Sequence, residues 1–290
     1  MNRKIDRRNA ILQKIDSLEQ LPTLPAIAQQ VISKALNPSV TFKELQKIIS
    51  YDPPLTARVL KTANSVYYGR RTPAKSIEDA IFTIGLNDLS SICLSTSVIE
   101  SFVHYDQRLL DRRTLWKHSI STGALFESLA KRNNLDKSFN YLLAGLLHDI
   151  GWMILDHVAP EILGLALQSA EAREWSNVVE KKLFGLHHSE IGAIVLEQWN
   201  IPPEIIPIVL NHHAPEKADD YQKPAKFLQL ASLLSPYKLP LITIESEITL
   251  DKSLGLNLPK KEITLDKLRK HYKKEITYAE DITELSLGWL

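Results

Sequence analysis

The sequence predicts an all-α fold of two packed helical subdomains, an N-terminal helical bundle followed by a second helical core. Three observations predict it. The 290 residues include only 10 glycines, apolar residues recur with a helical period over most of the chain, and helix-start signals follow one another at short intervals. Hydrophobic residues make up 44% and charged residues 24%, as in globular proteins, and a chain of this length can bury a core in each subdomain.

Short helices, several of them with a recognisable start signal, are predicted for the first hundred residues. Thr41 and Glu44 have the spacing of a capping box, Asp52 precedes a proline that suits the first helical position, and Ser76 precedes an apolar run. Together with the periodicity, these signals predict helices at about 4–18, 24–36, 42–50, 53–65, 77–84 and 88–101.

Longer helices are predicted between residues 112 and 213. Breaks are expected at 133–134, at Gly185 and at 200–203, where Pro203 suits the first turn of the following helix. The breaks are short and none has the composition of a flexible linker. This region therefore forms one packed helical core.

Beyond Pro215 the helical pattern weakens. Residues 242–250 alternate apolar and polar side chains, which predicts a strand, and a last helix is predicted at about 264–277. Basic residues within 252–274 are interleaved with acidic ones, which is typical of a solvated face; a docking surface for an acidic partner is the alternative. We expect three segments, bounded at 1–111, 112–235 and 236–290, the last a C-terminal extension.

The composition argues against several classes of protein. The formal net charge of +1 is too balanced for a phosphate-binding surface, so nucleic acid is not an expected partner. The single cysteine, Cys93, lies in an apolar run and is interpreted as a buried hydrophobe. The N-terminus lacks the apolar core of a signal peptide, and no run approaches the roughly 20 apolar residues that span a bilayer. These features predict a cytoplasmic protein without a membrane span.

Histidines are concentrated in the second helical region, which holds seven of the nine. His118 shares a helical stripe with Leu115 and Leu125, so its ring is expected to face the core. Each histidine alone is explained as a hydrogen-bonded core residue or by a helix dipole. Their joint order indicates a shared site, because two pairs of histidines are placed at helix ends. His187 and His188 lie at the start of one helix, and His212 and His213 lie at the end of the next.

An adjacent histidine and aspartate, His148 and Asp149, follow the apolar segment 141–147 at the end of a helix that is expected to be buried. Burying such a pair without a partner is costly. A divalent cation would satisfy both side chains, and Gly151 would let the backbone turn so that neighbouring side chains converge. Imidazole nitrogen and carboxylate oxygen suit zinc, iron or manganese.

Two families share these motifs. Residues 112–213 resemble the HD superfamily of metal-dependent phosphohydrolases in the segments 116–119, 147–151, 188–192 and 212–213. Upstream, the chain resembles the amino-terminal half of the HDOD family, an HD-related output domain of bacterial signalling proteins, in the segments 21–26, 52–55, 63–65 and 80–85. Together the resemblance covers about residues 15–235. It implies a metal site that includes His118, His148, Asp149, His188, His212 and His213.

The sequence departs from the catalytic members of the HD superfamily at the positions that their chemistry needs. Ser232 stands where the resemblance places a final aspartate, Trp152 where the cyclic-di-GMP hydrolases have lysine, and Thr114 where they have a carboxylate. Their Gly-Tyr-Pro loop is replaced by 214–216. Phosphodiester hydrolysis needs an activated water and positive charge on the phosphate oxygens, so these losses predict weak catalysis or none.

We therefore expect a bacterial signal-transduction or regulatory HDOD protein without catalytic residues, which binds a signalling protein or a nucleotide second messenger and keeps a residual metal site. In this interpretation, metal or ligand occupancy shifts helix packing. The alternative is a metal-dependent phosphohydrolase acting on a nucleotide or a cyclic dinucleotide. A third interpretation treats the histidines as core residues only and the segment 64–69 as a partner surface, although Asn64 also suits the C-terminal cap of a helix.

Overall fold

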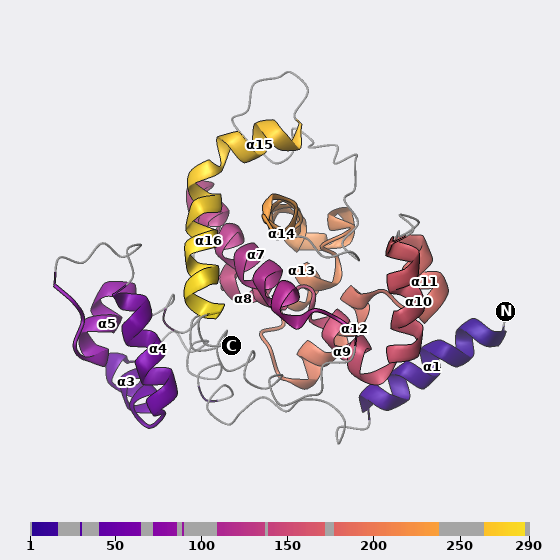
Figure 1. Ribbon diagram of the computed structural model, residues 1–290, viewed down its shortest axis with the longest axis horizontal. Coiled ribbons are helices and arrows are strands. Elements are labelled where there is room, and N and C mark those ends of the chain that lie inside the picture. Colours follow the sequence, from indigo (N-terminus) through magenta and orange to yellow (C-terminus); the bar gives the residue numbers. More distant parts are fainter. Residues whose placement is uncertain are drawn as a thin grey trace. The chain divides into compact units, whose positions relative to one another are not determined.

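The computed structural model describes residues 2–16, 30, 41–64, 72–85, 89, 109–136, 139–171, 177–237 and 264–287. Within these ranges all regular structure is helical, which confirms the all-α prediction (Figure 1). The expected strand at 242–250 and the expected helices at 24–36 and 88–101 lie outside the described residues, except that Gln30 and Leu89 are helical.

The chain divides into two compact units. The larger unit consists of Met1–Leu21 and Asp106–Glu280, and the smaller of Pro22–Tyr105 and Asp281–Leu290. This division differs from the expected segments in placing the N-terminal helix α1 (Asn2–Asp16) in the larger unit. The physical reason is that α1 packs on two helices of the larger unit and buries Ile11 and Ile15 almost completely.

The smaller unit contains three complete described helices, α3 (Phe42–Ser50), α4 (Pro53–Ala63) and α5 (Ile77–Ile84), and the described residues 281–287 at the end of the last helix. Their starts confirm the sequence signals. The Thr41 hydroxyl accepts a hydrogen bond from the Glu44 backbone N–H at 3.4 Å, the Asp52 carboxylate caps α4, and the Ser76 hydroxyl caps α5. The apolar faces of these helices form the core of the unit, with Leu45, Ile49, Leu55, Val59, Ala80 and Ile81 buried.

Asn64 has a structural role in the smaller unit. It ends α4, and its side chain pairs with both backbone groups of Ala74: Nδ2 donates to the carbonyl oxygen at 3.0 Å, and Oδ1 accepts from the N–H at 2.5 Å. The side chain thus ties together two segments that are ten residues apart. This supports the interpretation of Asn64 as a cap, while Ser65 to Gly69 lie outside the described residues.

In the larger unit, helix α7 packs against α8 and α14, and α12 packs against α9 and α13 (Figure 1). The predicted breaks at 133–134 and Gly185 are confirmed, because Asn134 and Gly185 have positive φ angles of 51° and 79°. The bounds of the helices are α7 (Arg112–Arg132), α8 (Tyr141–Leu147), α9 (Ile150–Val158), α10 (Pro160–Glu171), α11 (Asn177–Phe184), α12 (His188–Gln198), α13 (Ile206–Leu210), α14 (Gln222–Leu234), α15 (Leu265–His271) and α16 (Lys273–Leu287).

Two sequence predictions for this unit were wrong in detail. Pro203 does not begin a helix, because residues 203–205 form a turn and α13 starts only at Ile206. The single helix expected at 264–277 is two helices that meet at Tyr272. The Tyr272 ring is buried and lies 5.0 Å from the Arg132 guanidinium, so packing against α7 determines where the break falls.

None of the described helices is by itself long and apolar enough to cross a membrane. The consecutive segments Tyr141–Val158 and Pro160–Gln168 have the required length and apolar composition only when they are taken together, and the chain bends by 116° between them.

Gly151 allows helices α9 and α12 to approach closely. A Cβ atom added at this position would lie 1.9 Å from the backbone oxygen of His188, a distance that no side chain can occupy. From the sequence, this glycine was expected to let the backbone turn. The structure shows instead that it brings the start of α9 against the start of α12, and so places His188 beside Asp149.

The substitution Gly151→Ala is expected to destabilise the protein by about 2 kcal/mol, because an extra methyl group in a closed backbone contact forces the two helices apart. Urea denaturation followed by circular dichroism measures the change. Gly164→Ala in α10 is the matched control, since a Cβ there would meet only Leu109 Cδ1, at 3.7 Å. The control is expected to be neutral or slightly stabilising, and equal losses in both variants would contradict the prediction.

Candidate metal centre

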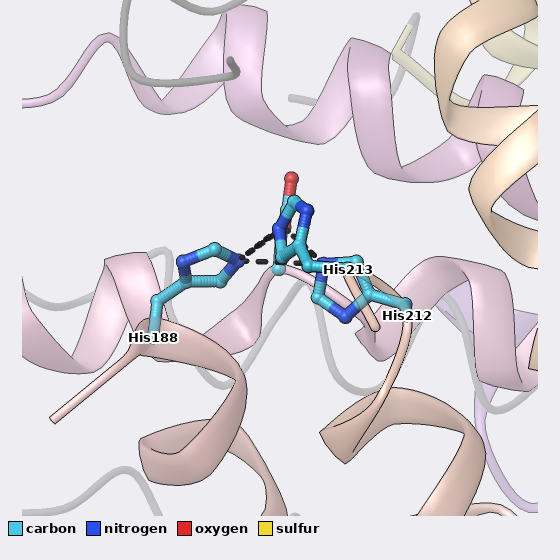
Figure 2. Close-up of side chains that lie close together, drawn as sticks. His188, His212 and His213 are labelled. Atoms are coloured by element: carbon cyan, nitrogen blue, oxygen red, sulfur yellow. Dashed lines mark hydrogen bonds and ion pairs between the residues drawn. The ribbon is translucent and has the colours of Figure 1, made fainter. Parts of the chain in front are cut away.

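The candidate site is assembled from four places in the larger unit. His118 lies in the middle of α7, and His148 and Asp149 occupy the break between α8 and α9. The other three histidines lie at helix ends: His188 is the first residue of α12, and His212 and His213 follow α13. Figure 2 shows the rings of His188, His212 and His213 converging from these two sides. The structure therefore brings together all six residues that the sequence singled out.

The Asp149 carboxylate lies between two groups of histidines. Its Oδ2 atom is 3.2 Å from His148 Nε2 and 3.5 Å from His118 Nε2. Its Oδ1 atom is 3.2 Å from His188 Nε2 and 3.7 Å from His212 Nε2. One carboxylate thus presents a separate oxygen to each group, which is how an aspartate serves two neighbouring cation sites.

The second group is extended by His213. The Nε2 atom of His188 is 3.2 Å from Nε2 of His213 and 3.4 Å from Nε2 of His212 (Figure 2). The potential ligand atoms therefore form two sets in which all members lie within 4.8 Å of one another: His118, His148 and Asp149 in one, and Asp149, His188, His212 and His213 in the other. Nitrogen and oxygen donors at such spacing suit zinc, iron or manganese.

Backbone carbonyls fix the protonation of three of the rings. A carbonyl oxygen only accepts hydrogen bonds, so the ring nitrogen that faces it carries the proton, and in a neutral ring the other nitrogen keeps its lone pair. In each of the three rings Nδ1 faces a carbonyl and Nε2 points into the cluster: His118 faces Tyr237 at 2.9 Å, His148 faces Gly145 at 2.6 Å, and His212 faces Val209 at 2.6 Å.

Two buried atoms of the cluster lack a hydrogen-bond partner. His148 Nε2 and Asp149 Oδ2 face one another at 3.2 Å, and neither has a hydrogen bond. When the His148 ring is neutral, with its proton on the Nδ1 atom that faces the carbonyl, both of the facing atoms are acceptors. The two residues are 0% and 2% exposed, so bulk water does not separate them. An acceptor pair of this kind needs a positive charge between its atoms, which either a second proton on His148 or a divalent cation supplies.

Charge is distributed unevenly over the second group. Burial alone would lower the pKa of His188, but the carboxylates of Glu180 and Asp149 raise it to about 10. Burial is the main reason that the pKa of His212 falls to about 3, and that the pKa of His213 also falls well below its usual value. His212 and His213 are therefore neutral, the state in which imidazole binds metal.

The structure also shows what occupies the positions where catalytic relatives differ. The Ser232 hydroxyl lies 3.2 Å from His118 Nε2, so this serine borders the cluster where a carboxylate would be a ligand. The Trp152 ring is buried and stacks on His188, with centroids 4.6 Å apart and planes at 22°. Thr114 instead donates its hydroxyl to Asp111 at 2.6 Å, as part of the cap of α7.

Glu180 belongs to the site but was missed in the sequence analysis. It lies on α11, is fully buried, and its carboxylate oxygens are 2.9 and 3.1 Å from Nδ1 of His188. Burial raises the pKa of this acid, but the charge of His188 and hydrogen bonds from His187 and His188 lower it to about 2. No local signal indicated it, because an acid on a different helix from its partner shares no helical spacing with that partner.

Comparison with protein families identifies the chain. The HDOD domain model matches residues 21–215, which is more than half of the sequence. The chain belongs to the HDOD family. A protein of Treponema pallidum (strain Nichols), described only as uncharacterized, is 28% identical over 218 residues, which are 74% of this chain and 41% of that relative. The HDOD chain thus spans less than half the length of this relative.

Solved structures share the fold of this HDOD chain. An HDOD domain protein of unknown function from Geobacter sulfurreducens has a TM-score of 0.79 at 23% identity, over 97% of this chain and 98% of that one. A candidate phosphohydrolase from Shewanella amazonensis SB2B has a TM-score of 0.71 at 22% identity, over 96% and 98%. A candidate signal transduction protein from Marinobacter aquaeolei VT8 has a TM-score of 0.73 at 22% identity, over 99% and 66%. At these identities the likeness shows the fold alone.

Proposed function

We propose that this HDOD chain is a regulatory module of bacterial signal transduction, organised around a buried divalent-metal centre, which acts by binding a signalling protein or a nucleotide second messenger and not by catalysis. The observation that carries the proposal is the buried pair of His148 Nε2 and Asp149 Oδ2, which lie 3.2 Å apart while neither atom has a hydrogen bond. A protein that keeps such a pair in its core gains stability when a cation occupies the space.

Six side chains would hold the metal: His118, His148, Asp149, His188, His212 and His213. A bound zinc, iron or manganese ion would neutralise the Asp149 carboxylate and accept the imidazole lone pairs. The rings come from α7, from the break between α8 and α9, from α12 and from the end of α13. Metal binding would therefore cross-link segments that are distant in sequence, which gives occupancy a direct influence on the stability of the larger unit.

The surroundings of the cluster favour regulation over hydrolysis. His118, His148, Asp149, His188 and His212 are each at most 2% exposed, which leaves little room for a phosphate to reach a metal that they hold. Trp152 supplies an apolar ring where a lysine would stabilise charge, and Ser232 a hydroxyl in place of a carboxylate ligand. Phosphoryl transfer depends on such charges, so their absence at these two positions lowers the expected rate by orders of magnitude.

The protein as purified is expected to contain tightly held divalent metal, and removal of the metal is expected to lower its melting temperature. A metal present at 100 times its Kd stabilises a protein by about 2.7 kcal/mol, which corresponds to roughly 5–10 °C for a unit of this size. Elemental analysis and thermal unfolding with and without a chelator measure both quantities. An unchanged melting temperature, or metal at background level after reloading, would overturn the metal centre.

A second candidate, a metal-dependent phosphohydrolase for a nucleotide or cyclic dinucleotide, is favoured by one feature of the cluster. His213 is partly exposed while its Nε2 atom lies 3.2 Å from that of His188, so one edge of the second group faces outward. Assays of the metal-loaded protein with cyclic-di-GMP and with nucleotide phosphodiesters separate the two functions. Turnover that disappears in His148→Ala would establish the hydrolase, and stoichiometric metal without turnover would support the regulatory module.

A further inference from the structure

Glu180 is a fully buried acid whose contacts concentrate on one histidine. Burying an ionised carboxylate is costly unless it receives several hydrogen bonds. The carboxylate accepts the backbone N–H of His188 and lies 2.9 and 3.1 Å from Nδ1 of the same residue. The neighbouring His187 is the next nearest base, with Nδ1 at 3.6 Å. The acid therefore holds both the backbone and the ring of His188 at the start of α12.

This contact determines how the His188 ring is oriented. A carboxylate only accepts, so Nδ1 of His188 carries a proton, and Nε2 is directed to the cluster. There it lies 3.2 Å from Asp149 Oδ1. Trp152, stacked on the ring at 4.6 Å, fixes its plane. A carboxylate behind a metal-binding histidine fixes its tautomer and makes it a stronger ligand, and losing such a partner typically lowers metal affinity about 10- to 100-fold.

The two halves of the cluster differ in the groups that hold their histidine rings. In the first half, which is His118, His148 and Asp149 Oδ2, the rings are held by neutral backbone carbonyls and the adjacent position is the Ser232 hydroxyl. The second half is His188, His212, His213 and Asp149 Oδ1. It has one more imidazole, and it has a buried carboxylate, that of Glu180, behind one of its rings. Four donors complete the coordination of a tetrahedral ion such as zinc.

We propose that Glu180 is a positioning residue that holds His188 for metal binding and makes the second half the tighter of the two cation sites. The inference rests on the proposed metal centre. It adds an order of occupancy, in which the second half fills first, and it assigns a role to a residue that lies outside the ligand set.

The test measures Zn²⁺ affinity by competition with a chromophoric chelator in two backgrounds. His118→Ala retains the second half intact, and His212→Ala disrupts it. Glu180→Gln is expected to weaken binding about 10- to 100-fold in the first background and to leave it unchanged in the second. A general folding defect would lower affinity in both. Thermal unfolding in chelator verifies that each variant is folded, and Glu180→Asp, which keeps the charge with a shorter reach, replaces Glu180→Gln if that variant unfolds.

Glu190→Gln is the matched control. Glu190 also lies at the start of α12, where it accepts the His187 backbone N–H at 2.7 Å and pairs with Lys181 at 3.5 Å, but it belongs to neither ligand set. The Glu190→Gln substitution is expected to leave Zn²⁺ affinity unchanged. If the unaltered chain binds no Zn²⁺, the proposed function fails. If it binds Zn²⁺ and Glu180→Gln matches the control, or weakens both backgrounds equally, only the role of Glu180 is overturned.

Discussion

Asp149→Asn is expected to abolish tight divalent-metal binding, with the apparent Kd for Zn²⁺ raised by more than about 100-fold. Loss of an outer partner of a ligand already costs about 10- to 100-fold, and Asp149 is the one carboxylate that belongs to both candidate ligand sets. Asparagine has the same shape but removes the charge, and its amide nitrogen replaces one oxygen at the cluster. Elemental analysis and chelator competition measure the loss.

The same substitution is expected to change the stability of the metal-free protein by about 1 kcal/mol or less, because two effects oppose each other. Loss of the charge weakens the contact with the buried His188 ring, 3.2 Å away, whereas an amide N–H in place of Asp149 Oδ2 can donate to a neutral His148 Nε2, also 3.2 Å away. Thermal unfolding in chelator measures this effect. A variant that loses metal while keeping its metal-free stability identifies Asp149 as a residue that is kept for binding and not for folding.

The buried acid Asp156 on α9 provides the control for this prediction. It accepts the Leu109 backbone N–H at 2.9 Å and lies 4.0 Å from the Arg112 guanidinium, and it belongs to neither ligand set. Asp156→Asn is expected to cost roughly 1–3 kcal/mol of stability with or without metal, and to leave Zn²⁺ affinity unchanged. Tight metal retention by Asp149→Asn, or a metal-free destabilisation as large as that of Asp156→Asn, would contradict the role given to Asp149.

The parts of the fold that the sequence predicted are those governed by local chemistry. Thr41, Asp52 and Ser76 are capping residues whose side chains each satisfy the N–H group three residues further on, so the pattern needs no knowledge of tertiary contacts. The break at Tyr272 was missed for the opposite reason. It depends on the burial of its ring beside Arg132, a residue of another helix.

The candidate site divides in the same way. The six ligand-type residues were predicted because their residue types and order carry the chemistry of metal binding. Glu180 and the close approach at Gly151 were not, because each acts on His188 from another helix. The residue that orients a metal ligand lies on whichever helix the fold packs against that ligand. The sequence of the ligand's own helix does not indicate which helix that is.

Ser232→Asp is expected to make the stability of the protein strongly dependent on metal. Ser232 is 7% exposed and its hydroxyl lies 3.2 Å from His118 Nε2, so an aspartate there would add a second buried carboxylate beside Asp149. Without a cation the two negative charges repel and are poorly solvated, at a cost of about 3 kcal/mol. The melting temperature in chelator is expected to fall by roughly 6–12 °C.

Excess Zn²⁺ is expected to restore the melting temperature of Ser232→Asp and to raise the bound metal, because the first half then has two carboxylates beside its histidines. Ser232→Ala is the control: it removes only a hydroxyl beside the His118 ring, is expected to cost about 1 kcal/mol, and gains no metal. Equal melting temperatures of the two variants in chelator would show that position 232 does not border the cluster. Metal gained by Ser232→Asp without phosphodiester turnover would place the obstacle to catalysis at the other departures from the catalytic pattern, among them Trp152, whose stacked ring supplies no cation to stabilise a phosphate at that position.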